Sequence, residues 1–389
     1  MQSAAILWHV SLLVPEHKRA LALGLVGLVR VVPVVFFSIL SGVAADVYDR
    51  RRLMLVTQAM ATILAAGLAV LTWRGLDAVW PVYVIAAASS AIGAFDLPAR
   101  QALIPNLVPR EHLANALTLN TIMFQVAAVA GPALGGIVIG QMGVAWAYAF
   151  NAVSFLVVIV ALLMMRGVSS RELAPLKAGE ADLKKTEFTA AAALDGLRFV
   201  FRAPLIRSTM LLDFFATFFS SATALLPIFA QDILGVGASG YGWLYAAPAA
   251  GAILTSAVMV KAVDLIERRG AVLVAAVMGY GLATVAFGLS RSFWLSFACL
   301  AATGATDTVS MVFRNLLRQL ETPDHLRGRM TGVNMIFFMG GPQLGELEAG
   351  LVANWLGAVV SVVTGGLGCM AATIWIAAKT PALRAYRRS

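Results

Sequence analysis

The sequence predicts an all-helical membrane protein built from two related six-helix bundles. Three observations support this class. The chain is 60% hydrophobic and only 13% charged, about half the charged fraction of a typical soluble domain. Apolar stretches of about 20 residues, the length that crosses a bilayer, recur along the whole chain. Several features occur twice, about 210–218 residues apart, as expected for a transporter made of two halves.

The repeated features keep the same order in both halves. Pro109-Arg-Glu-His-Leu113 returns as Pro323-Asp-His-Leu326. Gly131-Pro-Ala-Leu-Gly135 returns as Gly341-Pro-Gln-Leu-Gly345. This agreement over a large part of the chain indicates that one structural unit has been duplicated.

Eleven apolar stretches, and a shorter one at the start of the chain, are predicted to be helices. A segment inside a bilayer must satisfy its backbone hydrogen bonds as a helix or as a strand of a closed barrel. These stretches are too long, and alternate too little, to be barrel strands. In chain order they cover 20–44, 54–73, 79–104, 117–142, 146–165, 206–231, 241–262, 271–290, 292–317, 329–355 and 357–378.

The distribution of positive charge predicts the orientation in a bacterial inner membrane. If the loop after residue 45 is cytoplasmic, that side carries 24 Lys and Arg residues and the opposite side carries four. Cytoplasmic loops are enriched in Lys and Arg, so the central loop and the C-terminus are predicted to be cytoplasmic. The net charge of +9 is thereby explained by the bilayer, and nucleic acid is not expected as a partner.

A polar stretch at 167–205 divides the chain into an N-terminal bundle, 1–166, and a C-terminal bundle, 206–389. We interpret this stretch as a cytoplasmic linker. Residues 1–14 are apolar but too short to span a bilayer. Repeat symmetry suggests that they form the outer half of helix 1 in a chain that is truncated at its start. A re-entrant or interfacial segment is the alternative.

A loop with an acid followed by a basic cluster comes after the second helix. It contains Gly42, Asp46, Asp49, Arg50, Arg51 and Arg52, and a degenerate copy follows at 264–269. An acid here can cap a neighbouring helix while the basic cluster stays in water. The loop resembles the signature of the major facilitator superfamily, G-x-L-A-D-R-x-G-R-R, with Val47 in place of the first Arg. A purely topogenic basic loop is the alternative.

Gly131, Pro132, Gly135 and Gly136 resemble the G-P-x-x-G-G motif of antiporters in the same superfamily. Generic Gly-rich helix packing is the alternative. Residues 95–120 and 317–329 resemble the subgroup that contains enterobactin exporters and macrolide-efflux proteins. The resemblance implies twelve helices, alternating access and export coupled to the proton gradient. It also implies that helices 1, 4, 7 and 10 surround the cavity, while helices 2, 5, 8 and 11 join the halves.

Charges within the spans are functional candidates, because each costs at least about 2.5–3.5 kcal/mol to insert. Asp96 and Asp307 occupy nearly equivalent places in the two halves, and Asp213 lies in the seventh helix. Arg100 and Arg314 follow the first two acids on the same helix face. One interpretation is a set of structural ion pairs. The other is that one of these acids, most plausibly Asp307, carries a proton.

Arg30 on helix 2 and Glu346 on helix 11 are expected near the midplane. We hypothesise that they pair across the two halves when the outer side closes, with Glu348 as a neighbouring candidate. Local pairing of Arg30 within the first bundle is the alternative. Residues suited to an amphipathic ligand in the cavity are Gln125, Gln343, Phe214, Phe218 and Phe337.

The sequence therefore predicts a monomeric secondary transporter that exports an amphipathic small molecule in exchange for protons. An uncoupled or importing facilitator is the first alternative, and a membrane protein that does not transport is the second. No nucleotide-binding loop or catalytic triad is evident, so an enzyme is not expected. The four His residues lack the spacing of metal ligands, and no metal or cofactor is predicted.

Overall fold

The computed structural model describes residues 1–47, 49–165, 198–323 and 327–387 and contains helices without strands in these ranges. In these ranges ten helical segments are long and apolar enough to cross a membrane, and Gln2–Leu13 is a shorter apolar helix. The ten segments match ten of the predicted spans, and the remaining span, 329–355, lies in helix α14 (Arg327–Leu356) but is not among the ten. Contacts group the chain into one unit of Met1–Leu173 with Ala224–Ala246, and a second of Ala174–Thr223 with Ala247–Ser389. The predicted linker lies mostly outside the described residues.

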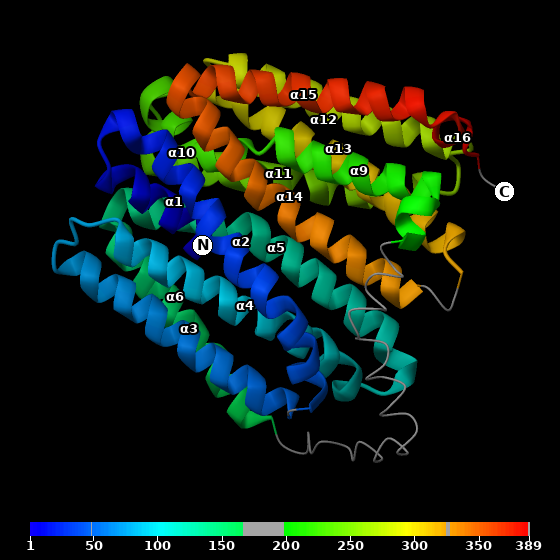
Figure 1. Cartoon of the computed structure of the whole chain (residues 1–389). Helices are drawn as coiled ribbons and strands as arrows, with labels where there is room; N and C mark the ends of the chain where they lie inside the picture. The colour runs from blue at the N-terminus through cyan, green and yellow to red at the C-terminus, as the bar shows by residue number, and fades with distance from the viewer. Residues whose placement is uncertain (48, 166–197, 324–326, 388–389) are drawn as a thin grey trace. The chain divides into compact units, whose positions relative to one another are not determined.

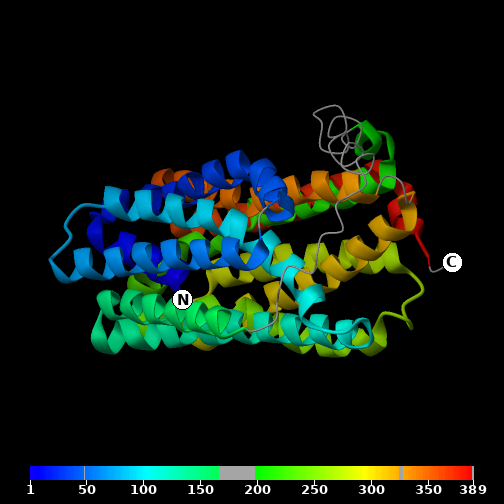
Figure 2. The ribbon, with the colours of Figure 1, turned by 90° about the horizontal axis from the view of Figure 1, so that it is seen from below.

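In the first unit the helices run roughly along one another (Figures 1 and 2). α3 packs between α6 and α4, and α2 packs along α4. The short α1 contacts α2, α5 and α6. The bounds are α1 Gln2–Leu13, α2 Glu16–Val47, α3 Arg50–Trp73, α4 Trp80–Leu107, the 3-10 turn η1 Arg110–His112, α5 Leu113–Met142 and α6 Val144–Met164.

In the second unit α12 packs against both α13 and α15, while α14 lies against α9 and α15 (Figure 1). Leu212, Leu273 and Phe313 form part of an apolar core that joins α9, α12 and α13. The bounds are α9 Pro204–Phe219, α12 Arg269–Leu289, α13 Phe293–Glu321, α14 Arg327–Leu356, α15 Ala358–Lys379 and α16 Pro381–Ala385.

The turns between helices also repeat. Gly143 separates α5 from α6 with φ of 93°, and Gly357 separates α14 from α15 with φ of 91°. A side chain is disfavoured at such positive φ, whereas glycine adopts it readily. The same tight reversal is thus built with the same residue in both halves, which agrees with the duplication inferred from the sequence.

The predicted span 206–231 differs from expectation because it is broken. α9 ends at Phe219, and a 3-10 turn, η2 (Ala222–Leu225), follows Ser220 and Ser221. The chain continues through α10 (Leu226–Ile228) and a π-helical turn, η3 (Phe229–Ile233), to α11 (Gly237–Ala262). Pro227 lacks an N–H and so cannot donate the backbone hydrogen bond of a regular helix, which favours an interruption here. The part after the break packs with the first unit.

Candidate functional site

A buried ion-pair cluster lies inside the second unit, between α9 and α13. One Arg314 nitrogen lies 3.1 Å from a carboxylate oxygen of Asp213 and 3.1 Å from one of Asp307. Arg318, one turn further along α13, lies 3.9 Å from the other oxygen of Asp213. Two carboxylates and two guanidinium groups therefore balance one another within an apolar core.

The two acids of this cluster differ in their exposure. The Asp213 side chain is 3% exposed and Arg314 is 2% exposed, whereas Asp307 is 42% exposed. Burying Asp213 as a charge is tolerable only because two guanidinium groups neutralise it. Asp307 has one such partner and is accessible from outside the protein. Asp307 is thus the more exposed acid of this cluster, with a single guanidinium partner.

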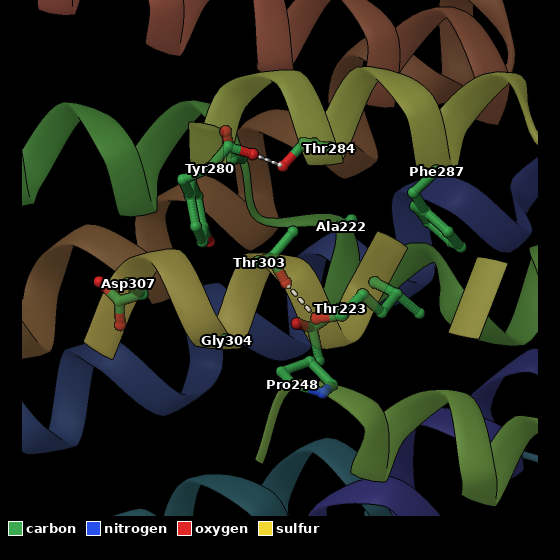
Figure 3. Close-up of a pocket in the computed structure, with 11 residues that line it drawn as sticks. Ala222, Thr223, Pro248, Tyr280, Thr284, Phe287, Thr303, Gly304 and Asp307 are labelled. Atoms are coloured by element: carbon green, nitrogen blue, oxygen red, sulfur yellow. Dashed lines mark hydrogen bonds between the residues drawn. The ribbon is translucent and has the colours of Figure 1, made fainter. Parts of the chain in front are cut away.

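A cavity of about 120 Å³ opens beside this cluster, where α9 is interrupted. Figure 3 shows Thr303 and Asp307 on adjacent turns of α13, with Tyr280 and Thr284 on α12 facing the same space. Pro248 of α11 and residues of the η2 turn close it on the other side. The interruption after α9 therefore leaves a small cavity within the second unit, lined in part by polar side chains.

The first unit contains a different arrangement around Asp96 of α4. Arg100 lies 2.7 Å from one Asp96 oxygen, four residues further along the helix. Thr57 and Gln58 of α3 donate hydrogen bonds of 3.0 and 2.8 Å to the other oxygen. Asp96 is only 13% exposed. Three donors therefore hold the Asp96 carboxylate, whereas one donor, Arg314, contacts its repeat counterpart Asp307.

The segment after the helix break is tied to the first two helices by polar contacts. Arg19 donates to both carboxylate oxygens of Asp232, at 2.9 and 2.7 Å. Gln231 donates to the Ser11 hydroxyl at 2.7 Å, and the Tyr241 hydroxyl donates to the Ala4 carbonyl at 2.9 Å. These bonds join α1 and the start of α2 to residues 231–241, and α10 lies beside α1 (Figure 1).

The signature loop is described in part. Asp49 caps α3, because its carboxylate accepts a 2.9 Å hydrogen bond from the Arg52 backbone N–H. Arg51 donates to the carbonyls of Leu162 and Leu163 at the end of α6. Cationic groups at a helix C-terminus are favourable there. The side chains of Gly42 and Asp46 lie outside the described residues.

The glycines of the G-P-x-x-G-G motif allow close helix approaches. A Cβ on Gly136 would lie 2.6 Å from the Gly242 Cα at the start of α11, and one on Gly135 would lie 3.1 Å from Met1. In the second half, a Cβ on Gly341 or Gly345 would collide with Thr217 or with the Phe218 carbonyl of α9. Small residues at these points let neighbouring backbones touch.

The predicted ligand-binding residues fall into two groups. Phe214 stacks on Phe218 with ring centroids 5.5 Å apart, and Phe337 of α14 meets Phe214 edge-on at 6.0 Å. These three rings form one aromatic cluster in the second unit. Gln125 lies on α5, and Gln343 lies on α14, six residues after Phe337. Gln125, Gln343, Arg30 and Glu348 are half-buried, and Glu346 is buried at 9% exposure.

Sequence reasoning missed four groups that complete these clusters: Arg318, Thr57, Gln58 and the Arg19–Asp232 pair. Thr57 and Gln58 lie in the predicted span 54–73, which has no ionisable residue, but polar side chains in an apolar span were a usable signal. No sequence signal pairs Arg19 with Asp232, which are 213 residues apart. The same-helix neighbours, Arg100 and Arg314, do contact Asp96 and Asp307 as predicted.

Comparison with known proteins completes this description. A family model described as a transmembrane secretion effector matches residues 1–387. The chain belongs to this family of the major facilitator superfamily. Membership in the transmembrane secretion effector family makes the chain a transporter of small molecules rather than an enzyme. It also makes the chain a multi-pass protein of the inner membrane.

Relatives within the family are similar over nearly the whole chain. The enterobactin exporter EntS of Escherichia coli O1:K1 / APEC is 25% identical over 382 residues, which cover 98% of this chain and 86% of that protein. The enterobactin exporter EntS of Shigella boydii serotype 18 is 26% identical, with the same coverage.

Solved structures of transporters share the fold at low sequence identity. A POT family transporter in complex with 5-aminolevulinic acid has a TM-score of 0.74 at 11% identity, covering 98% of this chain and 93% of that chain. A D-xylose-proton symporter has a TM-score of 0.71 at 13% identity, covering 96% and 93%. The helical fold expected from the sequence is thus confirmed.

Proposed function

We propose that this transporter exports an amphipathic small molecule, such as a siderophore or a macrolide, in exchange for protons by alternating access. The similarity to enterobactin exporters supports outward transport of a molecule of this size. The main observation that supports proton coupling is that Asp307, a half-exposed carboxylate, shares Arg314 with the buried Asp213. We place the central loop and the C-terminus in the cytoplasm and treat the monomer as the working unit.

The proposed coupling step is a reversible protonation. A proton from the outer side binds the Asp307 carboxylate and converts it to the neutral acid. Arg314 then remains paired with Asp213, so no guanidinium is left in the apolar core without a carboxylate. Release of the proton on the cytoplasmic side restores the ion pair. Arg314 thus pairs with two carboxylates in one state and with one in the other. A transport cycle requires such a difference between its states.

The net charge of the ion-pair cluster indicates which ligands a proton can displace directly. With both acids ionised, Asp213, Asp307, Arg314 and Arg318 sum to zero. Protonation of Asp307 raises this sum to +1, which repels a cation and attracts an anion. Direct electrostatic exchange therefore suits a cationic or neutral amphipathic ligand. An anionic siderophore would need a conformational coupling instead, so the charge of the exported compound tests the mechanism.

Proton release from energised everted membrane vesicles tests this proposal. A panel of siderophores, macrolides and lipophilic cations is added in turn, and the lumenal pH is followed with a dye. Alkalinisation triggered by one compound supports exchange and begins to identify the ligand. Accumulation of a compound without a pH change favours an uncoupled facilitator. No response to any compound, with the protein correctly inserted, favours a membrane protein that does not transport.

We also propose that residues 224–246 act as an outer gate on the first two helices. Reversing the charge of Arg19 with Arg19→Asp should open this segment, because the bidentate pair with Asp232 is replaced by a repulsion. An exposed ion pair is worth about 0.2–1 kcal/mol, so we expect alkylation of a Ser11→Cys reporter to rise about two- to fivefold. The reporter is placed in a background without Cys299 and Cys369.

Two further variants make the gate experiment decisive. Arg19→Asp combined with Asp232→Arg should return the labelling rate to its starting value. Arg74→Asp makes the same change at an exposed arginine that terminates α3 and should leave labelling unaltered. Equal labelling in Arg19→Asp and in Arg74→Asp would show that the pair does not hold the segment closed.

The Arg30–Glu346 pair remains a prediction that charge reversal can examine. Arg30→Glu and Glu346→Arg should each abolish transport, and the double variant should restore a substantial part of it if the two groups pair. Glu348→Arg combined with Arg30→Glu is the matched control, because Glu348 lies two residues along α14 and on another face. A double Arg30/Glu346 variant as inactive as the singles would leave Arg30 with a local partner in the first bundle.

A further inference from the structure

The cavity beside Asp307 has an unusual lining. Every polar side chain that reaches it ends in oxygen, and no lysine, arginine, histidine or amide side chain takes part. The oxygens come from residues 220–223, which follow α9, and from α12 and α13. In chain order these polar side chains are Ser220, Thr223, Tyr280, Thr284, Thr303 and Asp307.

Hydrogen bonding makes this lining richer in acceptors than in donors. The Thr284 hydroxyl donates its proton to the Tyr280 carbonyl at 2.9 Å, and the Thr303 hydroxyl donates to the Leu300 carbonyl at 2.6 Å. Figure 3 draws both bonds. A hydroxyl whose proton is committed to its own helix can offer the cavity only lone pairs. Asp307 adds a carboxylate, of which one oxygen is bonded to Arg314.

Ser220 adds a buried polar group to this lining. Its residue is 6% exposed, and its buried hydroxyl oxygen contacts the Cys369 thiol but has no stronger hydrogen-bond partner. The neighbouring Cys369 thiol is at most a weak donor or acceptor. Leaving a hydroxyl buried and unsatisfied costs about 1–3 kcal/mol, so such groups normally meet water, an ion or a ligand.

We propose that this cavity binds a small hydrated monovalent cation, with Na⁺ as the ion of matching chemistry. The ion is bound by hydroxyl oxygens and by Asp307, next to the C-terminal end of α9. Carbonyls at a helix C-terminus carry partial negative charge and favour a cation. Broken helices in secondary transporters place such groups near coupling ions. This inference deepens the proposed coupling, because it gives the Asp307 site a second ion.

The charge of the site favours a monovalent ion over a divalent one. Asp307 is the single acid in the lining, and Arg314 already neutralises part of its charge. Ca²⁺ and Mg²⁺ sites in proteins usually use several carboxylates. Within the described ranges there is no group of three His, Cys, Asp or Glu side chains that could hold a metal ion. One partly neutralised carboxylate among hydroxyls matches an ion of charge +1.

Thermal stability of the purified protein in detergent tests the proposal without any transport. Melting is followed in choline chloride and in NaCl at equal ionic strength and at pH 8. A ligand that binds only the folded state raises the melting temperature with saturating dependence on its concentration. We expect such a rise with Na⁺, and bound ²²Na⁺ that unlabelled Na⁺ displaces. Identical melting curves in the two salts, without displaceable ²²Na⁺, would overturn the proposal.

Matched variants assign the effect to the cavity. Ser220→Ala with Thr303→Val removes two lining oxygens and should abolish both the melting shift and the ²²Na⁺ signal. Thr364→Val is the control, since this exposed threonine on α15 also donates to its own helix but lies away from the cavity. A shift retained by the cavity variant would place any Na⁺ elsewhere. Absent Na⁺ binding together with proton release from vesicles would refute this inference alone and leave proton-coupled export standing.

Discussion

Replacing Asp213 by asparagine should be the most destabilising single change among the charged residues of this transporter. The side chain is 3% exposed and faces both Arg314 and Arg318. Asparagine removes the negative charge but leaves two guanidinium groups in an apolar core. Breaking a buried ion pair from one side costs about 3–5 kcal/mol. We expect a large fall in melting temperature in detergent and low yield from the membrane.

Asp232→Asn is the matched control for this prediction. It makes the same chemical change just beyond the same predicted span, at a carboxylate that is 44% exposed. An exposed pair is worth about 1 kcal/mol or less, so the control should melt close to the wild type. If the two variants lost equal stability, the Asp213 cluster would not be the electrostatic core that its burial indicates. Asp213→Glu should recover part of the loss, because it restores the charge.

The length of the apolar stretches was sufficient to predict ten of the eleven spans, because a bilayer demands long apolar helices wherever the chain crosses it. It was not sufficient to predict the break after Phe219. The apolar run continues through Leu225 and Ile228, so hydropathy alone reads one helix. The interruption is favoured by local backbone chemistry, namely the missing N–H of Pro227, and hydropathy does not detect this.

The candidate site could be predicted as far as contacts within one helix. Helical spacing brings Arg100 to Asp96 and Arg314 to Asp307, and the structure has both pairs. The sharing of Arg314 with Asp213 depends on how α9 packs against α13, which no sequence spacing encodes. The same limit explains why Thr57 and Gln58 were missed as partners of Asp96.

The two repeats differ in the hydrogen bonds made by their equivalent acids. Asp96 and Asp307 occupy equivalent places, yet one accepts three hydrogen bonds and the other accepts one. Asp307 also borders a cavity that lies within the second unit. Two halves with the same fold thus surround equivalent acids differently, and our proposal assigns ion exchange to the acid with fewer donors.

Asp307→Asn should abolish proton coupling while leaving the folded protein intact. The side chain is 42% exposed, and its loss leaves Arg314 paired with Asp213, so stability should change little. Asparagine cannot release a proton at physiological pH. In everted vesicles we expect compound-induced proton release to fall to the background level. Exchange of labelled for unlabelled compound without a gradient should continue, because that process needs no net protonation.

Two further variants serve as controls for Asp307→Asn. Asp77→Asn alters an exposed acid in the loop between α3 and α4 and should retain full proton release. Asp96→Asn alters the repeat counterpart, whose carboxylate accepts hydrogen bonds from three donors, and should reduce stability more than coupling. Proton release that survives Asp307→Asn but disappears in a well-folded Asp96→Asn protein would move the coupling acid to the first bundle. Loss of proton release in Asp307→Asn alone would identify Asp307 as the group that binds the transported proton.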